Sequence, residues 1–350
     1  MKKLIDKNRI YGLDGLRFVA AISVVLFHYI SYSVDKEFAL ILQKSNFGWL
    51  VSISKYGFLG VELFFMISGF VILYSAQNKS WQDFTKSRFI RIYPTLWLAA
   101  TITFFGVLLL GSTSKDPTVT QYLANLTLMH RFVFNQPHLD GVYWTLTTEL
   151  RFYLIIGVML AFGWLTEKKL KSVMVIWSVL AITYLSLGKA GNFITYGAYF
   201  SAGVGFYYYW AEDKTFYNKL YLLFTLIASI YSGIIAHSDL NLSNNIIGLI
   251  ITAYFGCFYF LLNGYQLPIS NKVLVSLGGI TYPLYLLHQE LGYSLLQYVE
   301  KSANTYIAFS FITTMLMIFL AFIIYRYFEP RAHAITSKYC VDLIKKYEKK

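Results

Sequence analysis

Residues 57–76 read GFLGVELFFMISGFVILYSA, a run of twenty residues in which Glu62 is the only charged side chain. At ~1.5 Å per residue, a helix of this length crosses roughly 30 Å of hydrocarbon. The run therefore predicts a transmembrane helix. Ten such runs are expected in the chain, and they lie at 16–34, 57–76, 92–110, 149–166, 172–188, 193–210, 219–236, 245–263, 273–292 and 304–328.

The composition of the 350 residues agrees with a membrane protein. Hydrophobic residues make up 57% and charged residues only 14%, whereas an ordinary soluble domain carries about 25% charged residues. The chain cannot cover a soluble globule of its size with charge. We therefore predict an all-α, polytopic transmembrane helix bundle that forms a single domain over residues 1–350.

The net charge of +12 has two possible explanations: the protein binds nucleic acid, or its basic residues set its orientation in the membrane. Most of the 30 lysines and arginines fall on segments that are cytoplasmic if the N-terminus is cytoplasmic. Basic residues are retained on the cytoplasmic side of membrane proteins, so the second explanation accounts for the charge without nucleic acid. Both termini are expected in the cytoplasm, and residues 331–350 are expected to form a short basic tail there.

The first expected span carries two unusual side chains. Arg17 and His28 are eleven residues apart, which is about 16 Å along a helix and close to three turns. They should lie on one face, with Arg17 at the cytoplasmic mouth and His28 near mid-membrane. A structural histidine bonded to a neighbouring helix remains the plain alternative, but ionisable groups inside a span are candidate functional groups.

The second span adds Glu62 near its outer third and Ser68 near the middle. Glu62 is a possible partner of His28. Ser68 and Gly69 either pack against another helix, because small residues allow close approach, or contribute to a site at the depth of His28.

Two arginines, Arg88 and Arg91, stand three apart before Tyr93 and Pro94. On a helix they face one way and form a pair suited to phosphate. Their alternative role is to orient the protein. With Arg17 at the same mouth, they favour an anionic cofactor.

Several polar residues follow later in the chain. Glu149 lies at the extracytoplasmic entrance of the fourth span, after His138 and Asp140, and Tyr282 and His288 lie in the ninth. Glu329, after the tenth, is expected to anchor the chain at the interface. Neither a Walker loop nor a GxSxG elbow is present, and no spacing typical of metal ligands occurs, so we predict no metal.

Five stretches resemble the membrane acyltransferase-3 family, the integral membrane O-acyltransferases of bacterial envelope glycans. They are 12–17 followed by His28, 60–70, 88–94, 144–153 and 278–288, in family order over nearly the whole chain. In 60–70 the acidic position is Glu62, where the family often has Asp.

The resemblance implies transfer of an acyl group, usually acetyl from acetyl-CoA, to a sugar hydroxyl at the bacterial inner membrane. It implies His28 as the catalytic base, with Glu149 orienting His28 or the acceptor and Glu62 as the competing candidate. The donor site would use Arg17, Arg88, Arg91 and Ser68. Asp14, Tyr282 and His288 would contact substrate or support the site.

Two other classes of function remain open on the sequence. A transporter of a sugar, a lipid or an acyl group would also place charges in a bundle core, but it predicts matched broken spans in two related halves. A non-catalytic assembly partner would not need His28. The sequence leaves open the acceptor glycan, the acyl chain, direct transfer against an acyl-histidine intermediate, and the oligomeric state.

Overall fold

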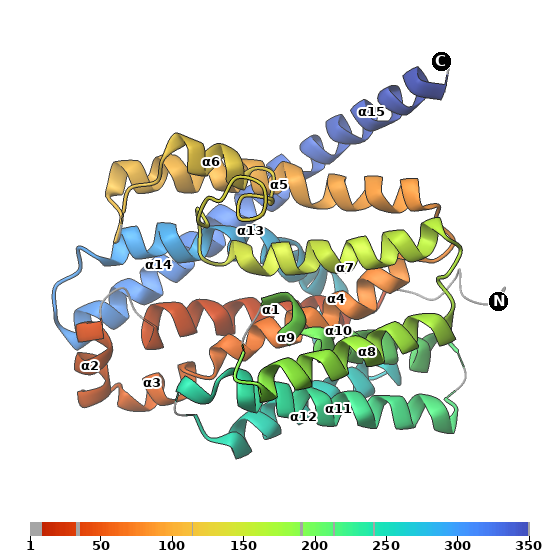
Figure 1. Cartoon of the computed structure of the whole chain (residues 1–350). Helices are drawn as coiled ribbons and strands as arrows, with labels where there is room; N and C mark the ends of the chain where they lie inside the picture. Colours follow the sequence, from red (N-terminus) through yellow and green to blue (C-terminus); the bar gives the residue numbers. More distant parts are fainter. Residues whose placement is uncertain are drawn as a thin grey trace. The chain divides into compact units, whose positions relative to one another are not determined.

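The computed structural model describes residues 9–32, 36–113, 115–189, 192–212, 214–240 and 242–348. These residues form helices and turns without a strand (Figure 1). The principal helices are α1 (Tyr11–Leu26), α2 (Lys36–Lys44), α3 (Gly48–Ser54), α4 (Gly60–Ala76), α5 (Trp81–Leu110), α6 (Val119–Asn125), α7 (Tyr143–Ala161), α8 (Glu167–Ser186), α9 (Asn192–Thr195), α10 (Gly197–Ala211), α11 (Phe216–Ala236), α12 (Asn244–Leu262), α13 (Asn271–Leu296), α14 (Ala303–Ile323) and α15 (Glu329–Glu348).

Eight helical segments of the described residues are long and apolar enough to cross a membrane. The all-α, multi-pass prediction is therefore confirmed. The expected spans at 193–210 and 273–292 fall on α10 and α13, which are helices but not among the eight. The first has only 15 residues, and the second carries several polar side chains along its 26 residues. The count of ten spans and the orientation of the termini stay predictions.

The chain divides into two compact units. Unit 1 contains Met1–Ala20, Phe58–Trp81 and Thr148–Gly278, and unit 2 contains Ala21–Gly57, Gln82–Thr147 and Gly279–Lys350. Helices α1, α5, α7 and α13 each contribute to both units, because their residues fall on either side of a boundary, α5 by its first residue alone.

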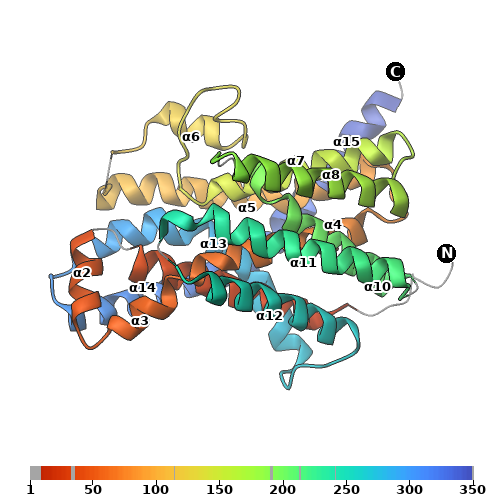
Figure 2. The same cartoon turned by 60° about the horizontal axis from the view of Figure 1, so that its bottom comes forward.

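Helix α10 is the centre of unit 1, and nearly all of its side chains are buried. It packs against α4, α8 and α11, and α11 also packs against α12 (Figure 2). The closest approach joins Gly69 on α4 to Gly203 on α10. A Cβ atom added to Gly203 would lie 2.1 Å from the backbone oxygen of Met66 and 2.8 Å from the Cα of Gly69. Backbone contact of this kind explains Gly69 as a packing residue.

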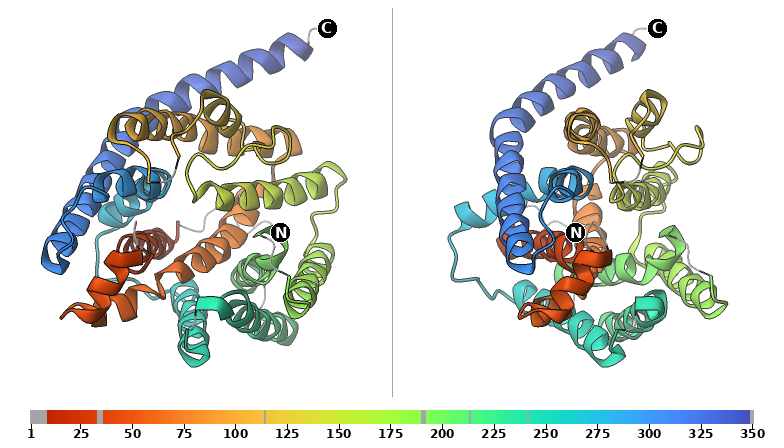
Figure 3. Two further views of the ribbon diagram at one scale, coloured as in Figure 1. Left: turned by 60° about the vertical axis from the view of Figure 1, so that its left-hand side comes forward. Right: turned by 90° about the vertical axis from the view of Figure 1, so that its left-hand side faces the viewer.

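Unit 2 contains the turn that follows α1, the hairpin of α2 and α3, and the C-terminal helices. Its α14 continues through a π-helical turn, Ile324–Phe328, into α15. Figure 3 shows the helix axis changing direction between α14 and α15. Residues 329–348, most of the expected tail, are helical.

Candidate active site

The first span is not one uniform α-helix. Helix α1 ends at Leu26, and Phe27–Ser31 form a π-helical turn in which the N–H of Tyr32 bonds the carbonyl of Phe27 at 2.8 Å. Such turns are rare and are often found at functional sites. His28 lies in this turn, so the expectation of a continuous α-helix from Arg17 to His28 is wrong at its far end.

His28 contacts His288, a residue 260 positions later in the chain. Nδ1 of His28 lies 3.0 Å from Nε2 of His288. The other nitrogen of His288, Nδ1, lies 2.9 Å from the carbonyl oxygen of Tyr285. Because a carbonyl only accepts, Nδ1 of His288 must carry the proton, and Nε2 of the neutral ring is then an acceptor.

This arrangement decides which nitrogen of His28 is protonated. Nδ1 of His28 must donate to His288, so Nε2 of His28 keeps its lone pair. His288 is completely buried, whereas His28 is partly exposed. Among the described residues, Nε2 of His28 is the one ring nitrogen of the pair without a hydrogen bond to the other ring or to the Tyr285 carbonyl.

Two tyrosines hold the π-helical turn against α13. The hydroxyl of the fully buried Tyr29 donates to the carbonyl of His288 at 2.6 Å. Gly292 makes room for this ring, since a Cβ there would lie 2.0 Å from the Tyr29 hydroxyl. Tyr293 donates to the carbonyls of His28 at 3.3 Å and Tyr32 at 2.9 Å. The contacts fix His28 relative to His288 through the backbone of both segments.

The connection between α6 and α7 reaches the same stretch of α13. Asp140 is fully buried, and its carboxylate accepts the N–H groups of Val142 at 3.0 Å and Glu290 at 3.1 Å. Burial, and then the nearby Glu290 carboxylate, raise the pKa of Asp140 well above its ordinary value. Asp140 therefore hydrogen-bonds the connection between α6 and α7 to the backbone N–H of Glu290, two residues after His288.

The predicted arginine pair lies on α5 in unit 2. The guanidinium of Arg88 is 5.8 Å from the ring centroid of Phe84, and that of Arg91 is 5.7 Å from the ring of Tyr282. Arg91 also lies 3.9 Å from the carboxylate of Glu329. An anion at this pair would therefore share Arg91 with a carboxylate.

Glu329 was expected to be an interface anchor, and the structure corrects this. Its residue is 3% exposed, and its carboxylate accepts the Thr95 hydroxyl at 2.9 Å. Tyr282 binds the same helix, because its hydroxyl donates to the carbonyl of Ile92 at 3.1 Å. Glu329 and Tyr282 thus fix the segment of α5 that carries Arg91.

The other predicted site residues belong to unit 1. Buried Asp14 pairs with Arg9 at 2.9 Å, and Arg17 is partly exposed. Ser68 is buried beside the contact of α4 with α10. The carboxylate of Glu149 accepts the hydroxyl of Tyr153, one turn later on α7.

Glu62 has a partner that the sequence did not suggest. Its Oε1 lies 2.8 Å from Nε2 of His237, the C-cap residue of α11. The expected partner was His28, which instead pairs with His288. His237 follows the apolar run 219–236 directly. A histidine at the end of a span is the one sequence signal that could have drawn attention to it.

Comparison with known proteins places the chain in a family. A family model described as "Acyltransferase domain" matches residues 10–326. The chain belongs to this acyltransferase family. No solved structure gives a significant match. Among the described residues, no group of three or more His, Cys, Asp or Glu side chains is placed to hold a metal ion.

Three relatives show what the family members are called. The chain is 26% identical over 205 residues to the O-acetyltransferase OatA of Staphylococcus aureus, covering 54% of this chain and 30% of that protein. It is 28% identical over 189 residues to YrhL of Bacillus subtilis, provisionally named a peptidoglycan O-acetyltransferase, covering 49% and 27%. It is 29% identical over 163 residues to the O-acetyl transferase of Shigella phage Sf6, covering 42% and 45%. The alignments thus span less than half of each relative.

Proposed function

We propose that this membrane protein transfers an acyl group, in the first instance acetyl, from cytoplasmic acyl-CoA to a hydroxyl of a cell-envelope sugar. Membership in the acyltransferase family and the O-acetyltransferase names of the relatives support the reaction class. The acceptor belongs to the envelope glycans: lipopolysaccharide O-antigen, exopolysaccharide, capsule or a lipid-linked precursor. The name of one relative adds peptidoglycan to these.

The observation that carries the proposal is the contact between Nδ1 of His28 and Nε2 of His288 at 3.0 Å. His288 accepts the Nδ1 proton of His28, which leaves the Nε2 lone pair of His28 as the available base. In the reaction, Nε2 takes the proton of the sugar hydroxyl as its oxygen attacks the thioester carbonyl. The carbon–sulfur bond breaks, and the same proton passes to the leaving thiolate, so no net proton is consumed.

The donor would be held by cations at the cytoplasmic mouth. Arg88 and Arg91 are the candidates in unit 2, and Arg17 is the candidate in unit 1. Coenzyme A is polyanionic, and guanidinium groups suit phosphates. Arg91 would hold the donor beside the Glu329 carboxylate, which lies 3.9 Å from its guanidinium. Ser68 remains a candidate for the acyl end of the donor.

Supporting roles are proposed for the remaining residues. Glu149, bonded to Tyr153, would orient the acceptor. Asp14 would support the start of α1 through Arg9. The protein would lie in the bacterial inner membrane with both ends in the cytoplasm, because that orientation puts most basic residues inside.

The test uses purified protein in lipid vesicles with labelled acetyl-CoA. The acceptor is envelope glycan from the host bacterium, treated with base to remove existing O-acetyl groups. We expect label in the glycan, and we expect a second base treatment to release it. Label that crosses the vesicle membrane without being attached to the glycan would instead indicate a transporter.

A further inference from the structure

The pair formed by Glu62 and His237 leaves a hydrogen-bonding group unused. Oε1 of Glu62 contacts Nε2 of His237 at 2.8 Å. The second carboxylate oxygen, Oε2, is buried and has no hydrogen-bond partner among the described residues. Buried polar atoms are nearly always bonded, and an unpaired buried acceptor is costly because it has lost its hydrogen bonds to water.

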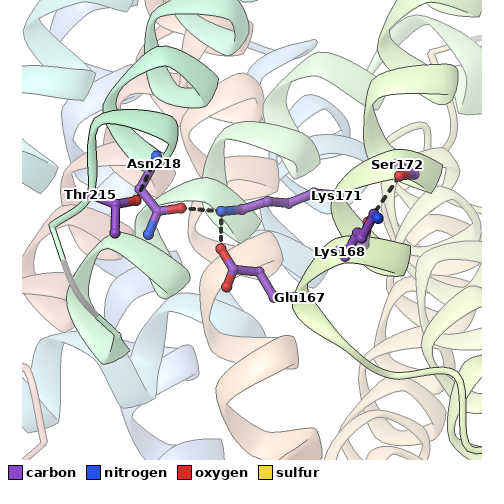
Figure 4. A network of polar contacts seen from close by, with 6 residues as sticks. All are labelled: Glu167, Lys168, Lys171, Ser172, Thr215 and Asn218. Atoms are coloured by element: carbon purple, nitrogen blue, oxygen red, sulfur yellow. Dashed lines mark hydrogen bonds and ion pairs between the residues drawn. The ribbon is translucent and has the colours of Figure 1, made fainter.

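A polar cluster in the same unit shows how a purely structural group is satisfied. Lys171 on α8 bonds the side chains of Glu167 and Asn218, as Figure 4 shows. Its ammonium group also lies 5.1 Å from the ring of Tyr208 and 5.2 Å from that of Tyr221. This cation is saturated with partners. The pair of Glu62 and His237 is not.

The exposure of the pair indicates from which side a ligand would arrive. The side chain of His237 is 15% exposed and that of Glu62 is 1% exposed. The ring of Phe58 lies 4.0 Å from the ring of His237. A ligand would therefore meet the imidazole of His237, packed on the buried Phe58 ring, before the carboxylate of Glu62.

Position in the chain suggests which compartment supplies that ligand. Glu62 is in the first turn of α4, and His237 is the C-cap of α11. In the proposed orientation, with the N-terminus in the cytoplasm, both helix ends face the extracytoplasmic side. Envelope glycans reach the protein from there.

We propose that Glu62 and His237 form a binding site for neighbouring hydroxyls of the acceptor glycan. A hydroxyl both donates and accepts, so one can bond Nδ1 of His237 whichever proton that ring holds. A second hydroxyl can donate to Oε2 of Glu62. Glu62 also fixes the imidazole ring through Oε1. This site rests on the proposed function, because it takes the acceptor to be a sugar.

The test separates acceptor affinity from catalysis. Apparent KM for base-treated host glycan and kcat are measured with labelled acetyl-CoA for wild type, His237→Leu and Glu62→Gln. Each neutral hydrogen bond is worth a few-fold in affinity. We expect KM for the glycan to rise roughly threefold to tenfold, with kcat and acetyl-CoA affinity unchanged. His237→Gln, which keeps a hydrogen-bonding group, should recover part of the loss.

Lys171→Met is the matched control, because it disrupts the saturated cluster of the same unit. It should lower thermal stability and leave the KM for glycan unchanged. A parallel series uses glycan whose amines are blocked by N-acetylation. Unchanged affinity for blocked glycan supports hydroxyl recognition, and lost affinity would show instead that Glu62 binds an ammonium group.

Three results would overturn the site. The first is an unchanged KM in both His237→Leu and Glu62→Gln. The second is a fall in kcat alone, which would make the pair a catalytic base. The third is a rise in KM in Lys171→Met as large as in His237→Leu. Failure of wild-type protein to acylate any host glycan is a different outcome, since it refutes the proposed function itself.

Discussion

Two histidine-containing pairs, one in each unit, differ in which hydrogen-bonding atoms they leave unpaired. His28 pairs with a neutral imidazole whose other nitrogen is bonded to a carbonyl, so only Nε2 of His28 remains. His237 pairs with a carboxylate through Nε2, which leaves Nδ1 of the ring outside the pair, and Oε2 of Glu62 has no hydrogen-bond partner among the described residues. One free lone pair suits a base. A free acceptor beside a free ring nitrogen suits recognition of hydroxyls.

The strongest test of this contrast is His28→Gln. Glutamine keeps hydrogen-bonding capacity and similar bulk but cannot act as a base near neutral pH. Positioned general-base catalysis contributes typically ~10²–10⁴-fold. We expect transfer to fall by that factor while labelled acetyl-CoA still binds. Near-normal acylation of glycan by His28→Gln would refute His28 as the base, and Glu149 and His288 would then be the candidates.

His288→Leu removes the hydrogen-bond partner of His28 and leaves His28, the proposed base, in place. Without His288, Nδ1 of His28 loses its acceptor and the ring loses its fixed orientation. Misplacement of a reacting group by about 1 Å can cost ~10²-fold in rate, so kcat should fall by up to roughly that factor with acceptor KM unchanged. The pH–rate profile should also shift, because the proton on His28 is no longer held at Nδ1.

A merely structural His288 predicts another pattern. In that case the thermal stability of His288→Leu falls, and the surviving folded protein has a normal kcat and an unchanged pH profile. His288→Asn is the matched variant, since its amide oxygen can accept the Nδ1 proton of His28 as Nε2 of His288 does. Activity of the Asn variant as low as that of His288→Leu would contradict a role for this hydrogen bond in catalysis.

The donor arginines should give a smaller effect on affinity. A hydrogen bond to a charged group is worth roughly 1.5–3 kcal/mol, so Arg88→Ala should weaken acetyl-CoA binding about tenfold to a hundredfold. Salt should reduce this difference, because charges at a wet mouth are screened. Arg91→Ala should in addition lower thermal stability, because it leaves Glu329 buried without the cation that lies 3.9 Å away. Wild-type affinity in both variants, measured by titration, would refute the arginine site.

Periodicity and residue type predict the helices of this chain and its unusual polar residues. Hydrophobic runs predicted the helices, and His28 and His288 were both named, although not as a pair. Their contact links positions 260 apart and depends on a π-helical turn at Phe27–Ser31. Nothing in the local sequence fixes such a turn, since it is held by Tyr29, Tyr293 and Gly292 across helices.

Partners of buried charges were harder to predict than the charges themselves. The sequence marks Glu62 as unusual, but its bond to His237 arises because α4 and α11 both pack against α10 within unit 1. Glu329 looked like a charge at the end of a span, and only tertiary structure shows it bound to Thr95 and Arg91. The periodicity of a helix says which face is buried, not which group on another helix meets it.

A third histidine pair lies outside the membrane spans and offers the weakest expected effect. Nε2 of His130 lies 2.7 Å from Nδ1 of His138 in the connection between α6 and α7. Burial, and then the charge of Arg131, lower the pKa of His130 to about 4. Burial, His130 and Arg131 lower the pKa of His138 to about 4 as well. Nδ1 of His130 is buried without a hydrogen-bond partner among the described residues, so a proton added there finds no acceptor.

Both pKa values are depressed in the closed connection, so acid should open it. An opened connection has ordinary histidines that bind protons below a pH of about 6.5, whereas the closed form resists protonation down to about 4. The closed form should therefore lose stability as pH falls from about 6.5 to about 4, and lose no more below that.

Hydrogen exchange of residues 126–139, corrected for the intrinsic pH dependence, should show reduced protection at pH 5 relative to pH 7. The double variant His130→Gln, His138→Gln has no titrating ring and should lose this difference. If protection falls equally in that variant, another titrating group causes the effect. That group cannot be Asp140, because its raised pKa favours the closed form in acid.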